Sequence, residues 1–279
     1  MRQNELTNLD ELNKPGFINT VKVGLKMHGF WKCLALFIYL KQEEKNFIKT
    51  ARSESERLYR KNLLRQFKKI HNNVACPHSP FQFPLLSTYL ENLDVEGPIV
   101  ELGVFKGGST AKLSLLAKKT NRKLYVCDSF QGLPKPAIEG ENASPIFDTS
   151  NSFVFQEGEF AGSLEEVKKN VTEYGAIEVC EFVPGFFNES LPTLDISPAL
   201  IFIDVDYVSS ARDCIKNLWP RLKKNGYLFT HEAHMEDYIK GCMDMKWWEE
   251  TLGEPPPLMI GAGGGISPVV TGLCFIKKE

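Results

Sequence analysis

The chain has 279 residues and a formal net charge of −2, and 24% of its residues are charged. This near balance of charge argues against a protein that binds nucleic acid through a basic surface. Its seven cysteines are scattered, and no stretch has the features of a secretory signal. We therefore expect a reduced, cytoplasmic protein.

The first quarter of the chain predicts helices. Residues 17–44 and 45–72 carry apolar side chains at helical spacing, and the second stretch is rich in charge, as in a helix with one solvated face. The longest apolar run, Cys33–Leu40, is far shorter than the roughly 20 residues of a membrane span. We expect it to pack inside the protein or in a homodimer interface. A peripheral membrane contact through this N-terminal helix is the alternative.

A proline-rich break follows these helices. Pro77, Pro80 and Pro84 lie close together, and proline removes a helical hydrogen bond and restricts the residue before it. We predict an N-terminal helical extension over residues 1–73 and a second domain, which carries the site, over residues 74–279.

The most informative stretch lies near residue 100. Pro98–Leu102 is a short apolar run with β-branched residues, as in a buried parallel strand. Gly103 and Gly107 then lead into Ser109–Lys119, where leucine and alanine recur at helical spacing. A strand that passes through a glycine turn into a helix N-terminus is typical of a nucleotide-binding site, because the backbone can approach a ligand closely there.

The spacing indicates which nucleotide is bound. A dinucleotide fingerprint reads G-x-G-x-x-G, whereas this chain has G-x-x-x-G-G with Glu101 two residues before the first glycine. A carboxylate there would repel a pyrophosphate but suits a ligand with a cationic amino-acid end. The next predicted strand, Lys123–Cys127, ends at Asp128, which could accept both hydroxyls of a ribose. S-adenosylmethionine has an ammonium, a sulfonium and a ribose, so we expect this cofactor.

The rest of the chain alternates between strands and helices. Residues 135–160 have no sustained period, and we expect a long loop of the kind that covers active sites. Further helices are predicted over Leu164–Tyr174, Ser210–Lys223 and Met235–Leu252, and further strands over Ile177–Val183, Ala199–Ile203, Tyr227–Thr230 and Val269–Ile276. This alternation predicts an α/β fold with a doubly wound, mostly parallel sheet, whose ligands bind at the carboxyl ends of the strands.

Potential ligand side chains lie at or near the ends of four predicted strands: Glu101, Asp128, Asp204 with Asp206, and His231 with Glu232. The carboxyl ends of parallel strands meet at one edge of a sheet, so these side chains should gather there. A glycine-rich stretch at residues 261–265 lacks the Lys-Ser/Thr of a phosphate loop. A loop over the acceptor or a plain turn suits it better.

Several blocks of the chain resemble the macrocin O-methyltransferase family, metal-dependent enzymes that methylate hydroxyls of sugars and other natural products. The blocks are VELGVFKGGST (100–110), DSFQGLP (128–134), FAGSLEEVKKN (160–170), FVPGFFNESLP (182–192), IDVDYVSS (203–210) and LWPRLKKNGY (218–227). The resemblance covers about residues 74–235 and implies a Rossmann-like methyltransferase fold with S-adenosylmethionine as cofactor.

The resemblance also implies roles for individual residues. The cofactor would contact Glu101, Gly103 and Gly107 with its methionine end, Asp128 with its ribose and Ser163 with its adenine. Asp204 corresponds to a metal ligand and Asp206 to the general base. The family's fifth strand ends in Asp-Asp, where this chain has His231-Glu232, and the family's lid histidine has no counterpart between Asp128 and Ser163.

The His231-Glu232 pair leaves three interpretations open. Asp204, His231 and Glu232 could form a metal site with altered preference, since a ring nitrogen favours manganese, iron or zinc over magnesium. Asp204, Glu232 and waters could hold the ion alone, or the site could be lost. Asp204 and Asp206 project to the same side if the strand stays extended, whereas joint ligation by His231 and Glu232 requires the backbone to turn. His234 is a further candidate ligand, although a surface or packing role suits it better, and His28, His71 and His78 receive no role.

We therefore expect an O-methyltransferase that transfers a methyl group from S-adenosylmethionine to a hydroxyl of a sugar or other small metabolite, assisted by magnesium or manganese. The alternative is a non-catalytic S-adenosylmethionine-binding or interaction protein on the same fold, which the altered metal pair and the missing histidine favour. A nicotinamide-dependent enzyme is disfavoured by the glycine spacing.

Overall fold

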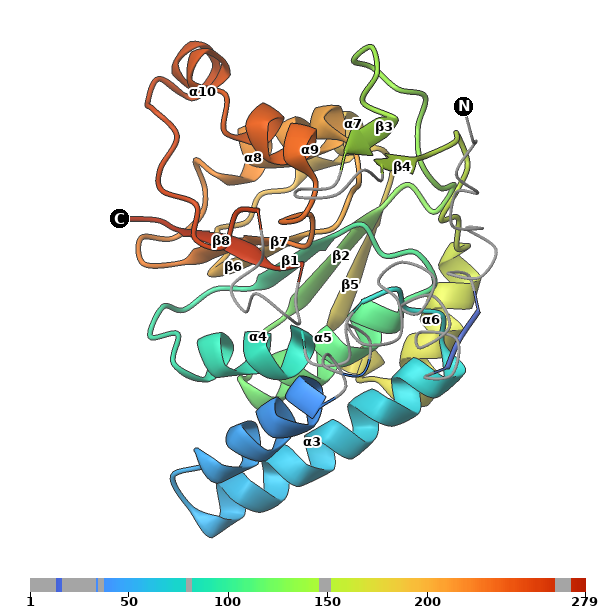
Figure 1. Ribbon diagram of the computed structural model, residues 1–279, viewed down its shortest axis with the longest axis vertical. Helices are drawn as coiled ribbons and strands as arrows, with labels where there is room; N and C mark the ends of the chain where they lie inside the picture. Colours follow the sequence, from blue (N-terminus) through green and yellow to red (C-terminus); the bar gives the residue numbers. More distant parts are fainter. Residues whose placement is uncertain (1–13, 17–33, 35–37, 79–81, 146–151, 264–271) are drawn as a thin grey trace.

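The computed structural model describes residues 14–16, 34, 38–78, 82–145, 152–263 and 272–279. A six-stranded sheet in the order β5-β2-β1-β6-β7-β8 runs through the middle of the molecule (Figure 1). The parallel strands are β1 (Ile99–Leu102), β2 (Leu124–Asp128), β5 (Cys180–Pro184), β6 (Leu200–Ile203) and β7 (Tyr227–Thr230), and β8 (Cys274–Lys277) pairs antiparallel with β7. This confirms the predicted doubly wound, mostly parallel sheet.

The strand order reverses direction at β1. The chain passes from β1 outward to β2 and β5, and then returns to the other side of β1 with β6. In register, Leu102 pairs with Cys127 of β2 and with Ile203 of β6. Open α/β sheets bind ligands at such a switch point, outside the carboxyl ends of the strands. The topology therefore places the candidate site where β1 and β6 end.

Helices cover both faces of the sheet (Figure 1). One face carries α3 (Glu54–Asn73), α4 (Gln82–Glu91), α5 (Gly108–Lys119) and α6 (Leu164–Tyr174), and the other carries α7 (Phe187–Ser190), α8 (Val208–Leu218), α9 (Glu236–Cys242) and α10 (Met245–Leu252). Strand residues alternate between the two cores. In β6, Leu200 and Phe202 belong to the first core, and Ile201 and Ile203 belong to the second.

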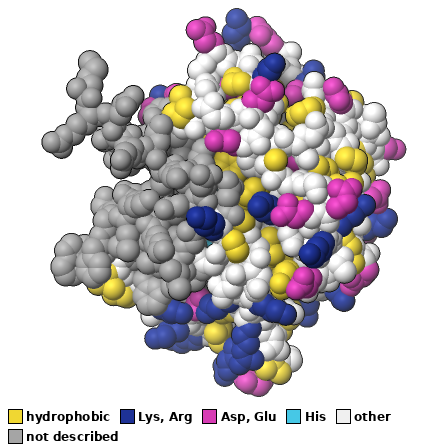
Figure 2. All heavy atoms as spheres, turned by 90° about the vertical axis from the view of Figure 1, so that its right-hand side faces the viewer, with side chains coloured by type: hydrophobic (Ala, Val, Ile, Leu, Met, Phe, Trp, Pro, Cys, Tyr) yellow, Lys and Arg dark blue, Asp and Glu magenta, His cyan; other side chains and the backbone are white. Residues whose placement is uncertain are grey.

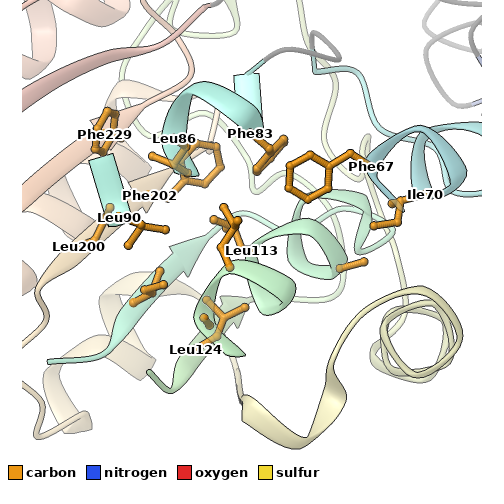
Figure 3. Close-up of a cluster of buried hydrophobic side chains, with 14 of the residues drawn as sticks. Phe67, Ile70, Phe83, Leu86, Leu90, Leu113, Leu124, Leu200, Phe202 and Phe229 are labelled. Atoms are coloured by element: carbon orange, nitrogen blue, oxygen red, sulfur yellow. The ribbon is translucent and has the colours of Figure 1, made fainter. Parts of the chain in front are cut away.

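The N-terminal helices join the first core. Residues 38–49 are helical, and α3 begins anew after Ser53, whose side chain accepts a hydrogen bond from the Glu56 backbone N–H. This capping interaction interrupts the helix predicted over residues 45–72. Phe67 of α3 packs edge-on against Phe83 of α4 with ring centroids 6.2 Å apart, and Phe83 in turn lies 5.9 Å from Phe202 of β6 (Figure 3). The domain division after residue 73 stays a prediction.

Other predicted elements differ in detail. Residues 135–160 contain an antiparallel pair, β3 (Ala143–Pro145) and β4 (Ser152–Val154), where a loop was expected. The helix predicted over Met235–Leu252 is two helices, because Asp244 caps α10 by accepting a 2.7 Å hydrogen bond from the Trp247 backbone N–H. The last strand begins at Cys274, and the predicted residues 269–271 lie outside the described residues.

Smaller differences affect three more predictions. The stretch Ile177–Val179 forms the 3-10 turn η1 before β5, and a second 3-10 turn, η2, spans Leu191–Thr193. The helix predicted over Ser210–Lys223 begins earlier and ends at Leu218. Of the glycine-rich stretch, residues 261–263 form a turn, and the remaining two lie outside the described residues.

The described surface mixes both signs of charge. On the face in Figure 2, acidic and basic side chains are interspersed across the described middle of the molecule. Among the described helices, none has the length and apolar character needed to cross a membrane. The six cysteines in the described ranges form no disulfide with one another.

Candidate active site

Gly103 brings the ends of β1 and β6 into direct contact. It has φ +87°, and a Cβ on this residue would lie 1.8 Å from the backbone oxygen of Asp204. Only glycine fits this conformation and this approach. The Asp204 backbone N–H completes the junction with a 2.8 Å hydrogen bond to the Leu102 carbonyl. The structure thus gives Gly103 a packing reason in addition to the cofactor contact that the resemblance implies.

Glu101 is a fully buried carboxylate in β1, one residue before the end of that strand. Neither of its oxygens has a hydrogen bond of normal geometry to a described residue, although the Ser109 and Thr110 hydroxyls lie close enough to favour the ionised form. Burial outweighs these hydroxyls and raises the pKa of Glu101 to about 8. A cationic group would satisfy both free oxygens.

Asp128 ties the first two strand ends together. Its Oδ2 accepts a 2.7 Å hydrogen bond from the Val104 backbone N–H, and its Oδ1 accepts a 2.6 Å bond from the Phe130 backbone N–H. Burial raises the pKa of Asp128, and these backbone donors oppose the rise. The carboxylate therefore shapes the glycine turn and lies at the strand edge where a ribose was predicted to bind.

Gly107 and Ser163 have local structural roles. Gly107 is the N-cap of α5 at φ +82°, and a Cβ there would lie 3.0 Å from Cγ1 of Val167 in α6. Ser163 caps α6 by accepting a 3.2 Å hydrogen bond from the Glu166 backbone N–H, the interaction that a serine makes in an S-x-x-E capping box. Whether either residue contacts a cofactor stays a prediction.

Asp204 lies between two imidazole rings. Its Oδ2 is 2.6 Å from Nε2 of His78, and its Oδ1 is 3.2 Å from Nδ1 of His231. Both rings belong to segments far from Asp204 in sequence, and their centroids are 4.6 Å apart. One atom of each residue lies within 4.8 Å of the other two, a spacing that could hold a metal ion. No other group of this kind occurs among the described residues.

His231 and Glu232 converge on the same place, as joint ligation required. β7 ends at Thr230, and the chain bends at the next residue. Nδ1 of His231 consequently lies 3.2 Å from Oε1 of Glu232 as well as 3.2 Å from Asp204. His234 is more remote, with its Nε2 4.0 Å from Oε2 of Glu232.

Asp206 does not continue an extended strand. β6 ends at Ile203, and Asp206 has φ +60°, a conformation that is uncommon outside glycine and is often found at functional sites. The condition for Asp204 and Asp206 to point the same way is therefore not met. The carboxylates of Asp204 and Asp206 still repel each other. Burial, followed by the negative charges of Glu232 and Asp204, raises the pKa of Asp206 well above its ordinary value.

His78 is the site residue that the sequence did not reveal. It lies in the segment between α3 and α4 and is buried, with its side chain 3% exposed. Nδ1 of its ring is 3.0 Å from Sγ of Cys76, which in turn lies 3.2 Å from the buried ammonium of Lys112 in α5. Lys112 also lies over the Phe83 ring at 4.9 Å. The short Cys-x-His spacing was the available signal, but it is common and carries little information alone.

These contacts set the charges of the group. Burial favours a neutral ring at His78, but Cys76 and Asp204 outweigh it and raise its pKa to about 9. Burial likewise opposes a thiolate at Cys76, but Lys112 and His78 lower its pKa well below the usual range. Partial burial opposes a charge on Asp204, and the two imidazoles nevertheless hold its pKa below the ordinary value.

The sheet order and the helices on both faces of the sheet define a Rossmann-like α/β fold, and the candidate site residues lie at the carboxyl ends of β1, β2, β6 and β7. The model of the Macrocin-O-methyltransferase (TylF) family matches residues 86–249, more than half of the chain. The chain belongs to this family.

Characterised relatives are similar over part of their length. The chain is 32% identical over 156 residues to 8-demethyl-8-(2,3-dimethoxy-alpha-L-rhamnosyl)-tetracenomycin-C 4'-O-methyltransferase of Streptomyces olivaceus, a match that covers 54% of this chain and 56% of that protein. It is 30% identical over 156 residues to demethyldecarbamoylnovobiocin O-methyltransferase of Streptomyces niveus, covering 54% and 58%. The chain therefore spans less than two thirds of these relatives.

Solved structures support the fold. The O-methyltransferase NovP matches with a TM-score of 0.57 and 22% identity, covering 87% of this chain and 99% of that one. The calicheamicin methyltransferase CalS11 matches with a TM-score of 0.52 and 18% identity, covering 86% and 91%. At these identities the likeness concerns the fold alone.

Proposed function

We propose that this protein is an O-methyltransferase that transfers a methyl group from S-adenosylmethionine to a hydroxyl of a sugar or another small metabolite. The observation that supports the cofactor best is Glu101, whose fully buried carboxylate has no good hydrogen-bond partner among the described residues. It lies directly before the glycine turn of β1, where the ammonium of a methionine moiety would provide the missing charge.

The other cofactor contacts follow from the same strand ends. Asp128 would accept hydrogen bonds from the ribose, and the turn from Gly103 to Gly107 would face the methionine moiety. Ser163 precedes α6, whose N-terminal region would border the adenine. The relatives named above methylate hydroxyls, by their printed names, and this supports a hydroxylated acceptor here.

Asp206 is our candidate for the general base. An alcohol is a poor nucleophile until it loses its proton, and a carboxylate with a raised pKa is a stronger proton acceptor. Burial together with the Glu232 and Asp204 charges raises the pKa of Asp206. Its left-handed backbone holds the carboxylate in a conformation that an ordinary strand end would not give.

We further propose that Asp204, His231 and Glu232 take part in binding a divalent ion, magnesium or manganese. Asp204 and His231 belong to the group whose ligand atoms lie close enough together to hold an ion. Glu232 is next to this group, because its Oε1 lies 3.2 Å from Nδ1 of His231. When bound, the ion would lower the pKa of a hydroxyl that it coordinates. The cytoplasmic location, the homodimer and the peripheral membrane contact stay predictions from the sequence.

The experiment combines calorimetry with a turnover assay. We expect the protein to bind S-adenosylhomocysteine, and Asp128→Ala to weaken that binding by about 1.5–3 kcal/mol, because it removes a charged hydrogen-bond acceptor. Asp206→Asn should keep the cofactor affinity and lose methyl transfer to a panel of glycosylated acceptors. Absence of S-adenosylhomocysteine binding would refute the function. Binding without turnover on the panel, at any pH and with any divalent ion, would favour the non-catalytic alternative.

A further inference from the structure

The imidazole of His78 is held in place by contacts on several sides. Cys76 lies 3.0 Å from its Nδ1 and Phe83 packs edge-on at 5.3 Å between ring centroids. With Nδ1 engaged, Nε2 is left to face Asp204 at 2.6 Å. A histidine that binds a metal through one nitrogen commonly has its other nitrogen fixed by a hydrogen-bonding partner, which sets the orientation of the ring. Cys76 stands in that position.

The distances suit a metal centre after a small adjustment. Two ligand atoms that each lie about 2.1 Å from one ion are roughly 3.0–3.4 Å apart in octahedral or tetrahedral geometry. The 3.2 Å distance from Asp204 Oδ1 to His231 Nδ1 is already in that range. The 2.6 Å distance from the other oxygen, Oδ2, to His78 Nε2 is that of a direct hydrogen bond. An ion would therefore need to move these two atoms apart by less than about 1 Å.

The three side chains also leave room for further ligands. His78 is almost wholly buried, whereas the side chains of Asp204 and His231 are 18% and 16% exposed. The protein thus supplies ligands from inside the molecule, and the partly exposed side remains accessible. Metal sites that carry out chemistry keep such open positions for water or substrate.

We propose that His78 is a metal ligand through Nε2 and that His78, Asp204 and His231 form a centre of two imidazoles and one carboxylate. This inference rests on the proposed function, since it concerns the metal assistance of the same site. Imidazole nitrogen suits manganese, iron, cobalt and zinc better than magnesium, which prefers oxygen ligands. The centre therefore binds these transition ions more tightly than magnesium. Cys76 is a positioning residue that orients the His78 ring.

The test uses the full chain freed of metal. Titration with cobalt(II), followed by visible absorption and by calorimetry, should show one saturable site in the wild type, with magnesium a weaker competitor. His78→Ala should weaken cobalt by about 100-fold or more, and Cys76→Ala by about 10–100-fold, the range observed for residues that orient metal ligands. His234→Gln is the matched control, because it alters a nearby histidine outside the proposed centre, and it should bind cobalt as the wild type does.

Two measurements keep the result interpretable. S-adenosylhomocysteine affinity and urea denaturation, both without metal, show whether each variant is folded. A folded His78→Ala protein with wild-type cobalt affinity and spectrum would overturn the proposal, as would a preference of the wild type for magnesium. A wild type that binds S-adenosylhomocysteine but no divalent ion would overturn the metal centre and leave the methyltransferase function standing. Failure to bind S-adenosylhomocysteine would instead refute the proposed function itself.

Discussion

Glu101 should make the stability of the cofactor-free protein depend on pH. Its pKa is raised from 4.5 to about 8, chiefly by burial. The folded protein therefore holds a proton that the unfolded chain loses above pH 4.5, so stability is fully present below that pH and falls as pH rises toward 8. At about 1.36 kcal/mol per pKa unit, the ionised carboxylate costs about 5 kcal/mol of folding free energy above pH 8.

Glu101→Gln tests this directly, because it keeps the shape of the side chain and cannot ionise. Urea denaturation between pH 5 and 9, without cofactor, should show the wild type losing several kcal/mol relative to the variant as pH rises. The ammonium of S-adenosylhomocysteine should favour the ionised carboxylate. At pH 7, calorimetry in buffers of different ionisation enthalpy should therefore detect proton release on binding to the wild type and less release in Glu101→Gln.

Parallel stability curves for the two proteins across this pH range would refute the assignment of a raised pKa to Glu101. Equal proton release and equal affinity for S-adenosylhomocysteine would show separately that Glu101 does not respond to the cofactor. The pH dependence of stability reports on the buried acid itself, and proton release on binding reports on whether the cofactor interacts with it.

Two further predictions concern packing. Phe67→Ala in α3 should lower the free energy of unfolding in urea by about 3–5 kcal/mol, because it removes a buried aromatic ring. Leu58 is 58% exposed on the same helix, so Leu58→Ala should change that free energy by no more than about 0.5 kcal/mol. Equal effects would mean that α3 is not anchored in the core. Gly103→Ala should disturb Asp204 and lower the melting temperature strongly, because the added Cβ would lie 1.8 Å from the Asp204 carbonyl oxygen. Gly140 has a similar φ of +82° and no atom within 4 Å of an added Cβ, so Gly140→Ala should show the cost of backbone strain alone. Similar losses in the two variants would contradict the close approach of Gly103 to Asp204.

Local patterns predicted the sheet well because each strand carries its own signal. An apolar run such as Leu200–Ile203 is buried on both faces, and the cap at Ser163 fixes where α6 begins. The same logic placed Glu101, Asp128 and Asp204 at one edge of the sheet, since parallel strands share a carboxyl edge. These inferences need only the order of the elements.

Contacts between distant segments had no such signal. His78 and Asp204 are 126 residues apart, and nothing in the spacing of either motif indicates that they meet. The sequence pattern also could not predict the conformation of Asp206. The apolar run before it favours an extended strand, whereas Asp206 has φ +60°, which is unusual for a residue other than glycine. Both failures fall within the candidate site, where local rules are most often broken.

Two imidazoles, those of His78 and His231, reduce the excess of negative charge around Asp204 and Asp206. The Asp-Asp pair that the resemblance implies for the family at these two positions would add two carboxylates beside Asp204 and Asp206. Here His231 stands at the first of these positions, and a second imidazole, that of His78, reaches Asp204 from the segment between α3 and α4. The buried acids still repel one another, as the raised pKa of Asp206 shows. The positive charges of His231 and His78 oppose this repulsion, because both act to lower the pKa of Asp206. His231→Asp in a protein that keeps His78 should therefore increase the repulsion at Asp206, and urea denaturation should show a larger gain in stability on adding manganese than in the wild type.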